Sequence, residues 1–146
     1  MVNTDLGEIQ IQQQRSDETE PRRERRVASA LHAELRLAMA RAAAAWRACG
    51  VEPGESVAIA LANHAETIVA CLGVARAGGV AVVVDPARSP REIEQLWMEE
   101  RWRFILAESR EEQAPAIRDF VLTRAEWRQA LKAAPPFTEP RATIAE

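Results

Sequence analysis

Residues 75–86 read ARAGGVAVVVDP, and this stretch decides the fold class. A helix-favouring run ends at Gly78 and Gly79, two residues that permit the left-handed turn at a helix end. The five residues 80–84 that follow are all apolar. Such an uninterrupted apolar run suits a parallel strand covered on both faces better than an antiparallel strand with one face in water. The stretch therefore predicts a helix followed by a buried parallel strand.

Upstream of this stretch the same order of helix, turn and strand is present. Apolar residues recur at steps of three and four from residue 29 to residue 49, and Gly50 follows as a helix stop. The Pro-Gly pair at residues 53–54 predicts a tight turn. Residues 56–61 are then a short apolar run of strand length. This part of the sequence predicts an amphipathic helix followed by the first buried strand.

Helix starts of one kind recur along the rest of the chain. Each has a Ser, Thr or Asn that is followed three residues later by Glu, which approximates a capping box. The pairs are Asn63 with Glu66, Ser89 with Glu92, and Thr123 with Glu126. A short apolar run at 104–107 and the segment 119–122, in which Asp119 precedes three apolar residues, supply two further strands between these helices. Alternating strands and capped helices with short links predict right-handed crossovers, hence an α/β fold whose parallel sheet has helices on both faces, in three layers.

The two ends of the chain differ from its middle. Residues 1–26 are polar, with clusters of Glu and Arg and almost no apolar periodicity, so we expect a disordered leader. Residues 135–146 are rich in proline and are expected to leave the fold as an extended tail. The sequence therefore predicts one α/β domain over residues 27–134.

Composition narrows the class of protein. The chain is 47% hydrophobic and 28% charged, with a formal net charge of −3, which is the balance of a soluble globular domain without a field of one sign for nucleic acid or membrane. No secretory signal opens the sequence, so a cytoplasmic location is expected. Cys49 and Cys71 have no ligand partner at metal-binding spacing, which leaves no metal site in view.

The motif at 75–86 is similar to the second core motif of adenylate-forming enzymes, the superfamily of acyl-CoA synthetases and peptide-synthetase adenylation domains. In that motif a helix ends in a basic residue, Ala and Gly, and a strand runs into Asp-Pro. The segments 50–58 and 61–64 resemble the family's turn into its first strand and the end of that strand, and 31–35 partly matches its first core motif. Val83 stands where many relatives have proline. The resemblance implies part of the N-terminal domain of an adenylate-forming enzyme.

The resemblance also implies a reaction, in which a carboxylate attacks the α-phosphate of ATP and the acyl-adenylate is then taken up by coenzyme A or a carrier thiol. The family uses Mg, a Ser/Thr/Gly-rich loop ending in Pro-Lys, an adenine motif, a ribose-binding Asp and a late catalytic Lys. None of these motifs is in this sequence, and its only lysine, Lys132, lies inside a predicted helix. We therefore expect an N-terminal fragment of such a ligase that is catalytically incomplete alone, with no catalytic residue and no cofactor of its own.

One residue is a candidate for ligand binding. His64 lies where a strand ends and a helix begins, a place where open α/β sheets often bind ligands, although a lone His there is more often a surface residue. A dinucleotide site is disfavoured because the turn at 62–65 has no Gly-x-Gly-x-x-Gly.

The alternative function is a non-catalytic interaction module on the same fold. Either reading predicts a partner, which is a polypeptide carrying the missing part of the enzyme or a second copy of the chain. Large aromatic residues are the candidate contacts, with the alternative that they fill the domain's own core. These residues are Trp97, Trp102, Phe104 and Trp127.

Overall fold

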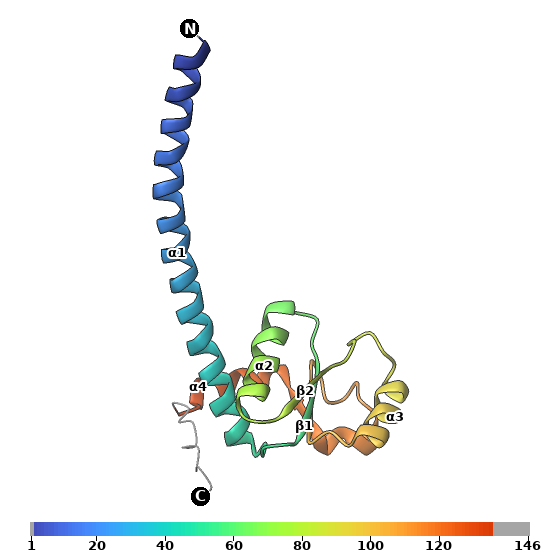
Figure 1. Cartoon of the computed structure of the whole chain (residues 1–146). Coiled ribbons are helices and arrows are strands. Elements are labelled where there is room, and N and C mark those ends of the chain that lie inside the picture. Colours follow the sequence, from blue (N-terminus) through green and yellow to red (C-terminus); the bar gives the residue numbers. More distant parts are fainter. Residues whose placement is uncertain (1, 136–146) are drawn as a thin grey trace, which may run out of the picture. The chain divides into compact units, whose positions relative to one another are not determined.

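The computed structural model describes residues 2–135, with side chains from residue 20 onward (Figure 1). The elements in chain order are α1 (Val2–Cys49), β1 (Ser56–Ala60), α2 (His64–Arg76), β2 (Val80–Val83), α3 (Pro90–Glu100), β3 (Phe104–Ala107), the 3-10 helix η1 (Pro115–Phe120), β4 (Val121–Thr123) and α4 (Arg124–Ala133). The chain divides into two compact units, Met1–Arg36 and Leu37–Glu146. Within the described residues no helix is both long and apolar enough to cross a membrane.

The four strands form one parallel sheet in the order β2-β1-β3-β4. β1 pairs with β2 on one side and with β3 on the other, so that Val57 lies between Ala81 and Phe104. The predicted parallel sheet is confirmed. The last strand begins at Val121 rather than at residue 119, because η1 occupies the chain up to Phe120.

Helices cover both faces of this sheet. One core cluster joins Trp46 of α1, Val74 of α2 and Trp127 of α4 to the sheet, and the other joins Ile93 of α3 and Ile117 of η1 to it. Figure 1 shows α2 and α3 on opposite sides of β1 and β2. The predicted three-layer α/β architecture is therefore confirmed.

β2 corrects one expectation about coverage. The strand is an edge of the sheet, and Val80 and Val83 are 55% and 67% exposed, whereas the apolar run predicted a strand buried on both faces. The apolar residues of β1 are buried, as that argument requires, because β1 lies between two strands. Local apolarity indicates that a strand belongs to a parallel sheet but does not fix its place in the strand order.

The three predicted helix starts are observed. The side chains of Asn63, Ser89 and Thr123 each accept a hydrogen bond from the backbone N–H of the Glu three residues later. Only the pair Thr123 and Glu126 forms the full reciprocal box. The carboxylate of Glu66 binds arginine side chains, so the box predicted at Asn63 is only half formed.

The N-terminal segment differs from the sequence-based expectation. α1 is helical from Val2, whereas residues 1–26 were expected to be a disordered leader. Glu, Gln and Arg in this segment favour the helix, and extending a helix whose far end is packed is much easier than nucleating a new one. The tail expected over 135–146 lies outside the described residues apart from Pro135.

α1 and α2 meet at backbone contact within the second unit. A Cβ atom built on Gly73 would lie 2.4 Å from the Cβ of Ala42 and 2.9 Å from its carbonyl carbon. Real Cβ atoms do not approach other atoms this closely. Only glycine allows the two helices to pack at this separation, which lets both of them cover the same face of the sheet.

Replacing Gly73 by Ala tests this contact. In a helix that exchange ordinarily stabilises by about 1 kcal/mol, but here the added methyl group overlaps Ala42, so we expect the free energy of unfolding to fall by about 1–3 kcal/mol. Urea denaturation measures the difference. The control is Ala75→Gly at an exposed position of α2, which should cost about 1 kcal/mol from helix propensity alone. A Gly73→Ala protein as stable as the parent would contradict the close approach.

Candidate functional site

The strand order points to the carboxyl ends of the strands, at one end of the sheet, as the place for a site. We call this end the carboxyl edge of the sheet. From β1 the chain crosses to β2 on one side, and it then returns to β3 on the other side. In open α/β sheets, ligands bind outside the carboxyl ends of the strands at such a switch point. Residues 61–66 follow β1 and residues 108–110 follow β3, so these two segments flank the switch point.

Charged side chains from three elements meet at this edge. Glu66, in the first turn of α2, accepts a bidentate pair of hydrogen bonds from Arg124, with Nε to Oε2 at 2.8 Å and Nη2 to Oε1 at 2.7 Å. Arg128, one turn further along α4, also donates to Glu66. Glu108, after β3, lies 3.6 Å from Nη1 of Arg124. The four side chains form what we call the edge cluster, with two carboxylates and two guanidinium groups.

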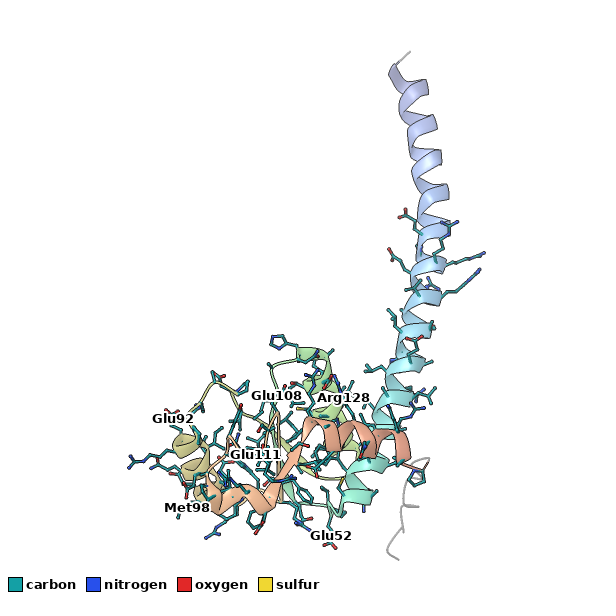
Figure 2. The ribbon with its side chains drawn as sticks, turned by 180° about the vertical axis from the view of Figure 1, so that it is seen from behind. Glu52, Glu92, Met98, Glu108, Glu111 and Arg128 are labelled. Carbon is teal, nitrogen blue, oxygen red and sulfur yellow. The ribbon has the colours of Figure 1, made fainter. Side chains whose placement is uncertain are left out.

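Figure 2 labels two members of the edge cluster, Glu108 and Arg128, at one end of the sheet, and Glu52 at the other end. Glu52 precedes β1, whereas Glu108 follows β3, which runs parallel to β1. The edge cluster therefore connects the chain just beyond the carboxyl ends of β1, β3 and β4. Through Glu66 and Arg124 it ties α2 to α4.

The electrostatics of the edge cluster are balanced internally. Hydrogen bonds from Arg124 and then Arg128 lower the pKa of Glu66 from its ordinary 4.5 to about 2. The side chain of Glu66 is 25% exposed and that of Arg124, its bidentate partner, is 27% exposed, which makes the pair better defined than an ordinary surface ion pair. Because Glu66 also lies in the first turn of α2, its negative charge is where a bound anion would be stabilised by the helix dipole.

A second ion pair adjoins the edge cluster on α4. Arg110 donates to the carboxylate of Glu126 and, through Nη2, to the carbonyl of Val121 at 2.9 Å. Burial opposes ionisation of Glu126, but hydrogen bonds from Thr123 and Arg110 outweigh it and lower the pKa of Glu126. This pair fixes the loop after β3 to the start of α4.

His64, the candidate residue for ligand binding, is the first residue of α2 and is exposed. It lies at the expected place, beside the switch point, but the residue of this turn that makes the ionic contacts is Glu66. A role for His64 in binding stays a prediction. Among the described side chains, no group of three or more His, Cys, Asp and Glu residues is arranged to hold a metal ion.

An apolar hollow of about 310 Å³ lies between α2 and α4, next to the edge cluster. Val69, Trp127 and Leu131 contribute its apolar lining, and Glu66 and Arg128 its charged part. The ring of Trp127 is buried and stacks on Trp46 with 4.1 Å between the ring centroids. The hollow is therefore a depression over the core.

Two of the aromatic residues considered as contacts for a partner belong to the core. Trp102 is 2% exposed and Trp127 is 1% exposed. Trp97 packs against the core, lies tilted against Phe120 with 4.8 Å between the ring centroids, and donates from Nε1 to the carbonyl of Trp102. The alternative, that these rings fill the domain's own core, is what the structure shows for Trp102 and Trp127.

The sequence matches the AMP-binding enzyme family over residues 11–142. The chain belongs to this family. No curated protein sequence matches this AMP-binding family member.

Solved structures of adenylate-forming enzymes share its fold. They include a benzoate CoA ligase from Burkholderia xenovorans, at 24% identity and a TM-score of 0.63, with 76% of this chain and 24% of the ligase covered. The N-terminal subdomain of Klebsiella oxytoca NpsA, in complex with 3-hydroxyanthranilyl-AMSN, matches at 19% identity and a TM-score of 0.63. This match covers 73% of this chain and 26% of the subdomain. The N-terminal domain of FACL13 from Mycobacterium tuberculosis matches at 19% identity and a TM-score of 0.64. This match covers 78% of this chain and 31% of that domain.

These comparisons establish the fold of this AMP-binding family member as that of the N-terminal domains of adenylate-forming enzymes. The chain spans between 24% and 31% of the length of the three structures. Sequence reasoning had found the family from the motif at 75–86, but not the edge cluster. Glu66 was read only as a helix cap, and nothing in the local pattern linked it to Arg124.

The edge cluster makes stability depend on pH. Because the pKa of Glu66 falls from 4.5 to about 2 on folding, its contribution is complete above pH 4.5 and is lost as the pH drops toward 2. We expect Glu66→Gln to lower the free energy of unfolding at pH 7 by about 1 kcal/mol. The difference from the parent should disappear between pH 4.5 and pH 2, as measured by thermal unfolding.

The control for this measurement is Glu99→Gln on the exposed end of α3. It removes the same charge without touching the edge cluster, so its effect should stay within a few tenths of a kcal/mol. If both variants behaved alike at every pH, the ion pairs of Glu66 would contribute nothing to stability.

Proposed function

We propose that this chain is the N-terminal segment of an ATP-dependent acid–thiol ligase that activates a carboxylate as an acyl-adenylate, and that it is catalytically incomplete alone. The observation that carries the proposal is the family match over residues 11–142 on a fold shared with CoA ligases and adenylation enzymes. The complete reaction uses ATP, Mg and coenzyme A or a carrier thiol. We place it in the cytoplasm.

The edge cluster does not fit ATP or Mg. The cationic groups beside the switch point, Arg124 and Arg128, are bound to Glu66, and Glu108 lies within 3.6 Å of Arg124. A phosphate would have to displace the chain's own carboxylate from the first turn of α2. The single lysine, Lys132, is exposed in the last turn of α4. On this proposal the segment supplies scaffold, and the groups that bind phosphate come from polypeptide outside these residues.

We expect no specific binding of ATP by this chain alone. Titration calorimetry with Mg-ATP should give no saturable heat, and pyrophosphate exchange with carboxylic acids should stay at background, because among the described side chains the arginines beside the switch point are already paired with carboxylates. Saturable binding at micromolar concentration would contradict this expectation. In that case Glu66→Gln, which removes the carboxylate shared by Arg124 and Arg128, and His64→Ala would identify the site.

A second candidate function, an interaction module without catalysis, is favoured by the exposed edge of the sheet. β2 offers unpaired backbone groups along one side. The side chains of Val80 and Val83 on β2 and of Ile68 on α2 are more than half exposed. Exposed strands of this kind recruit other chains. Under either function we propose the same partner, a polypeptide that carries the missing part of the enzyme and covers β2.

Co-expression with the phosphate-loop and catalytic-lysine part of a family enzyme tests both functions. We expect a stable complex, and Val83→Lys should weaken it at least tenfold because the substitution places a charge on the covered edge. Met98→Lys, at an equally exposed position on α3, is the matched control and should leave binding unchanged. Pyrophosphate exchange by the complex supports the ligase, whereas a complex without exchange supports the module.

A further inference from the structure

The exposed part of α1 has an apolar side. Val27, Leu31 and Leu35 are 59%, 60% and 41% exposed. They follow one another at steps of four residues, so they form a stripe along one side of the helix. A contiguous row of exposed aliphatic side chains marks an interaction site more often than scattered ones do.

The other side of the same segment is polar. Arg25, Ser29, His32 and Arg36 recur at steps of three and four, and together with the small residues Ala28 and Ala33 they line a shallow groove along the helix. The segment is therefore amphipathic, and its two sides are clearly distinct. We call the apolar side, defined by Val27, Leu31 and Leu35, the α1 stripe.

The sequence repeats the spacing of the α1 stripe nearer the start of the helix. Val2, Leu6 and Ile9 follow at steps of four and three, and the backbone is helical from Val2. Continuing in these steps through Gln13 and Glu20 leads to Val27. One line of positions along the helix thus has aliphatic residues at both ends and polar residues in the middle.

Charge is distributed unevenly along α1. Residues 2–20 hold five acidic residues and one arginine, a net charge of −4, whereas residues 21–36 hold five arginines and two glutamates, a net charge of +3. The helix is therefore acidic in its first half and basic in its second. When two copies of such a helix lie antiparallel, the acidic half of each faces the basic half of the other.

We propose that α1 pairs in antiparallel orientation with α1 of a second copy of this chain. Pairing about Glu20 places Ile9 opposite Leu31, whereas Leu35 comes opposite Asp5 of the partner copy. The same register places the acidic pair 17–18 opposite the basic pair 22–23 of the partner. One aliphatic pair and the opposite charges of the two halves of α1 thus favour the same register.

Two other occupants fit the pattern less well. Parallel pairing of two copies would bring acidic half against acidic half and basic half against basic half, and like charges in register destabilise a helix pair. A membrane surface would meet an amphipathic helix only half of which is basic, and anionic lipid repels the acidic half. The polarity reversal along α1 therefore favours a second copy.

This inference goes beyond the proposed function, because no residue of the α1 stripe belongs to the edge cluster or to β2. The two can fail separately. If the chain dimerises through α1 but never forms an active enzyme, the inference holds and the proposed function fails. If a monomeric chain binds the missing part of the enzyme, the proposed function holds and the inference fails.

Sedimentation equilibrium on the full chain tests the pairing. We expect Leu31→Glu with Leu35→Glu to raise the dimer dissociation constant at least tenfold. The matched control is Ser29→Glu with Ala33→Glu, which adds the same charge on the polar side and should leave the dimer in place. Circular dichroism checks that both variants keep their helix content. The inference would be overturned if the parent chain stayed monomeric at every concentration up to 100 micromolar, or if the two variants had equal effects.

Cross-linking tests the orientation. Cys49 and Cys71 are first replaced by Ala, and single cysteines are introduced as Gln10→Cys and Ala28→Cys, each one residue beyond a position of the apolar line. Antiparallel pairing predicts that a short bismaleimide joins a mixture of the two variants and neither variant alone. Cross-linking of each variant to itself would indicate parallel pairing and overturn the proposal. So would flotation of a monomeric chain with phosphatidylserine vesicles, which would indicate a membrane helix.

Discussion

The α/β unit depends on the indole of Trp46. This side chain is fully buried, stacks on Trp127 at 4.1 Å between ring centroids and donates from Nε1 to the carbonyl of Ala70 at 3.0 Å. Trp46 belongs to α1, Ala70 to α2 and Trp127 to α4, so one ring holds together the three helices on that face of the sheet. A buried indole N–H without an acceptor would be costly, and the carbonyl of Ala70 removes that cost while fixing the ring's orientation.

The packing around Trp46 has consequences at the carboxyl edge of the sheet. Because α2 and α4 both pack against this ring, their first turns lie close enough for Glu66 and Arg124 to form a bidentate pair. The switch point created by the strand order is thereby filled with the chain's own opposite charges. A surface whose donors and acceptors already pair with one another has little left to offer a phosphate, which is the physical reason to regard this segment as scaffold.

Much of the fold follows from local patterns in the sequence. The strands, the capping residues Asn63, Ser89 and Thr123, and the parallel sheet are all confirmed, because each is encoded by residues that are near one another in the chain. The place of β2 at an edge was missed, since strand order depends on which crossovers pack together. The edge cluster was missed for the same reason: Glu66 and Arg124 are far apart in sequence, and the signal at Glu66 had a sufficient local explanation as a cap.

On the two proposals, the exposed surfaces of the two units bind partners of different kinds. An edge strand such as β2 binds through backbone groups, which are the same in every chain, so its selectivity has to come from the side chains of Val80 and Val83 and from the shape of what covers them. The α1 stripe has no free backbone groups, because a helix satisfies its own, and its selectivity comes from charge and spacing along the helix. Salt therefore weakens pairing through α1 by screening its two halves, while it leaves strand pairing at β2 largely unchanged. One chain can in this way hold two associations apart, since the conditions that weaken one have little effect on the other.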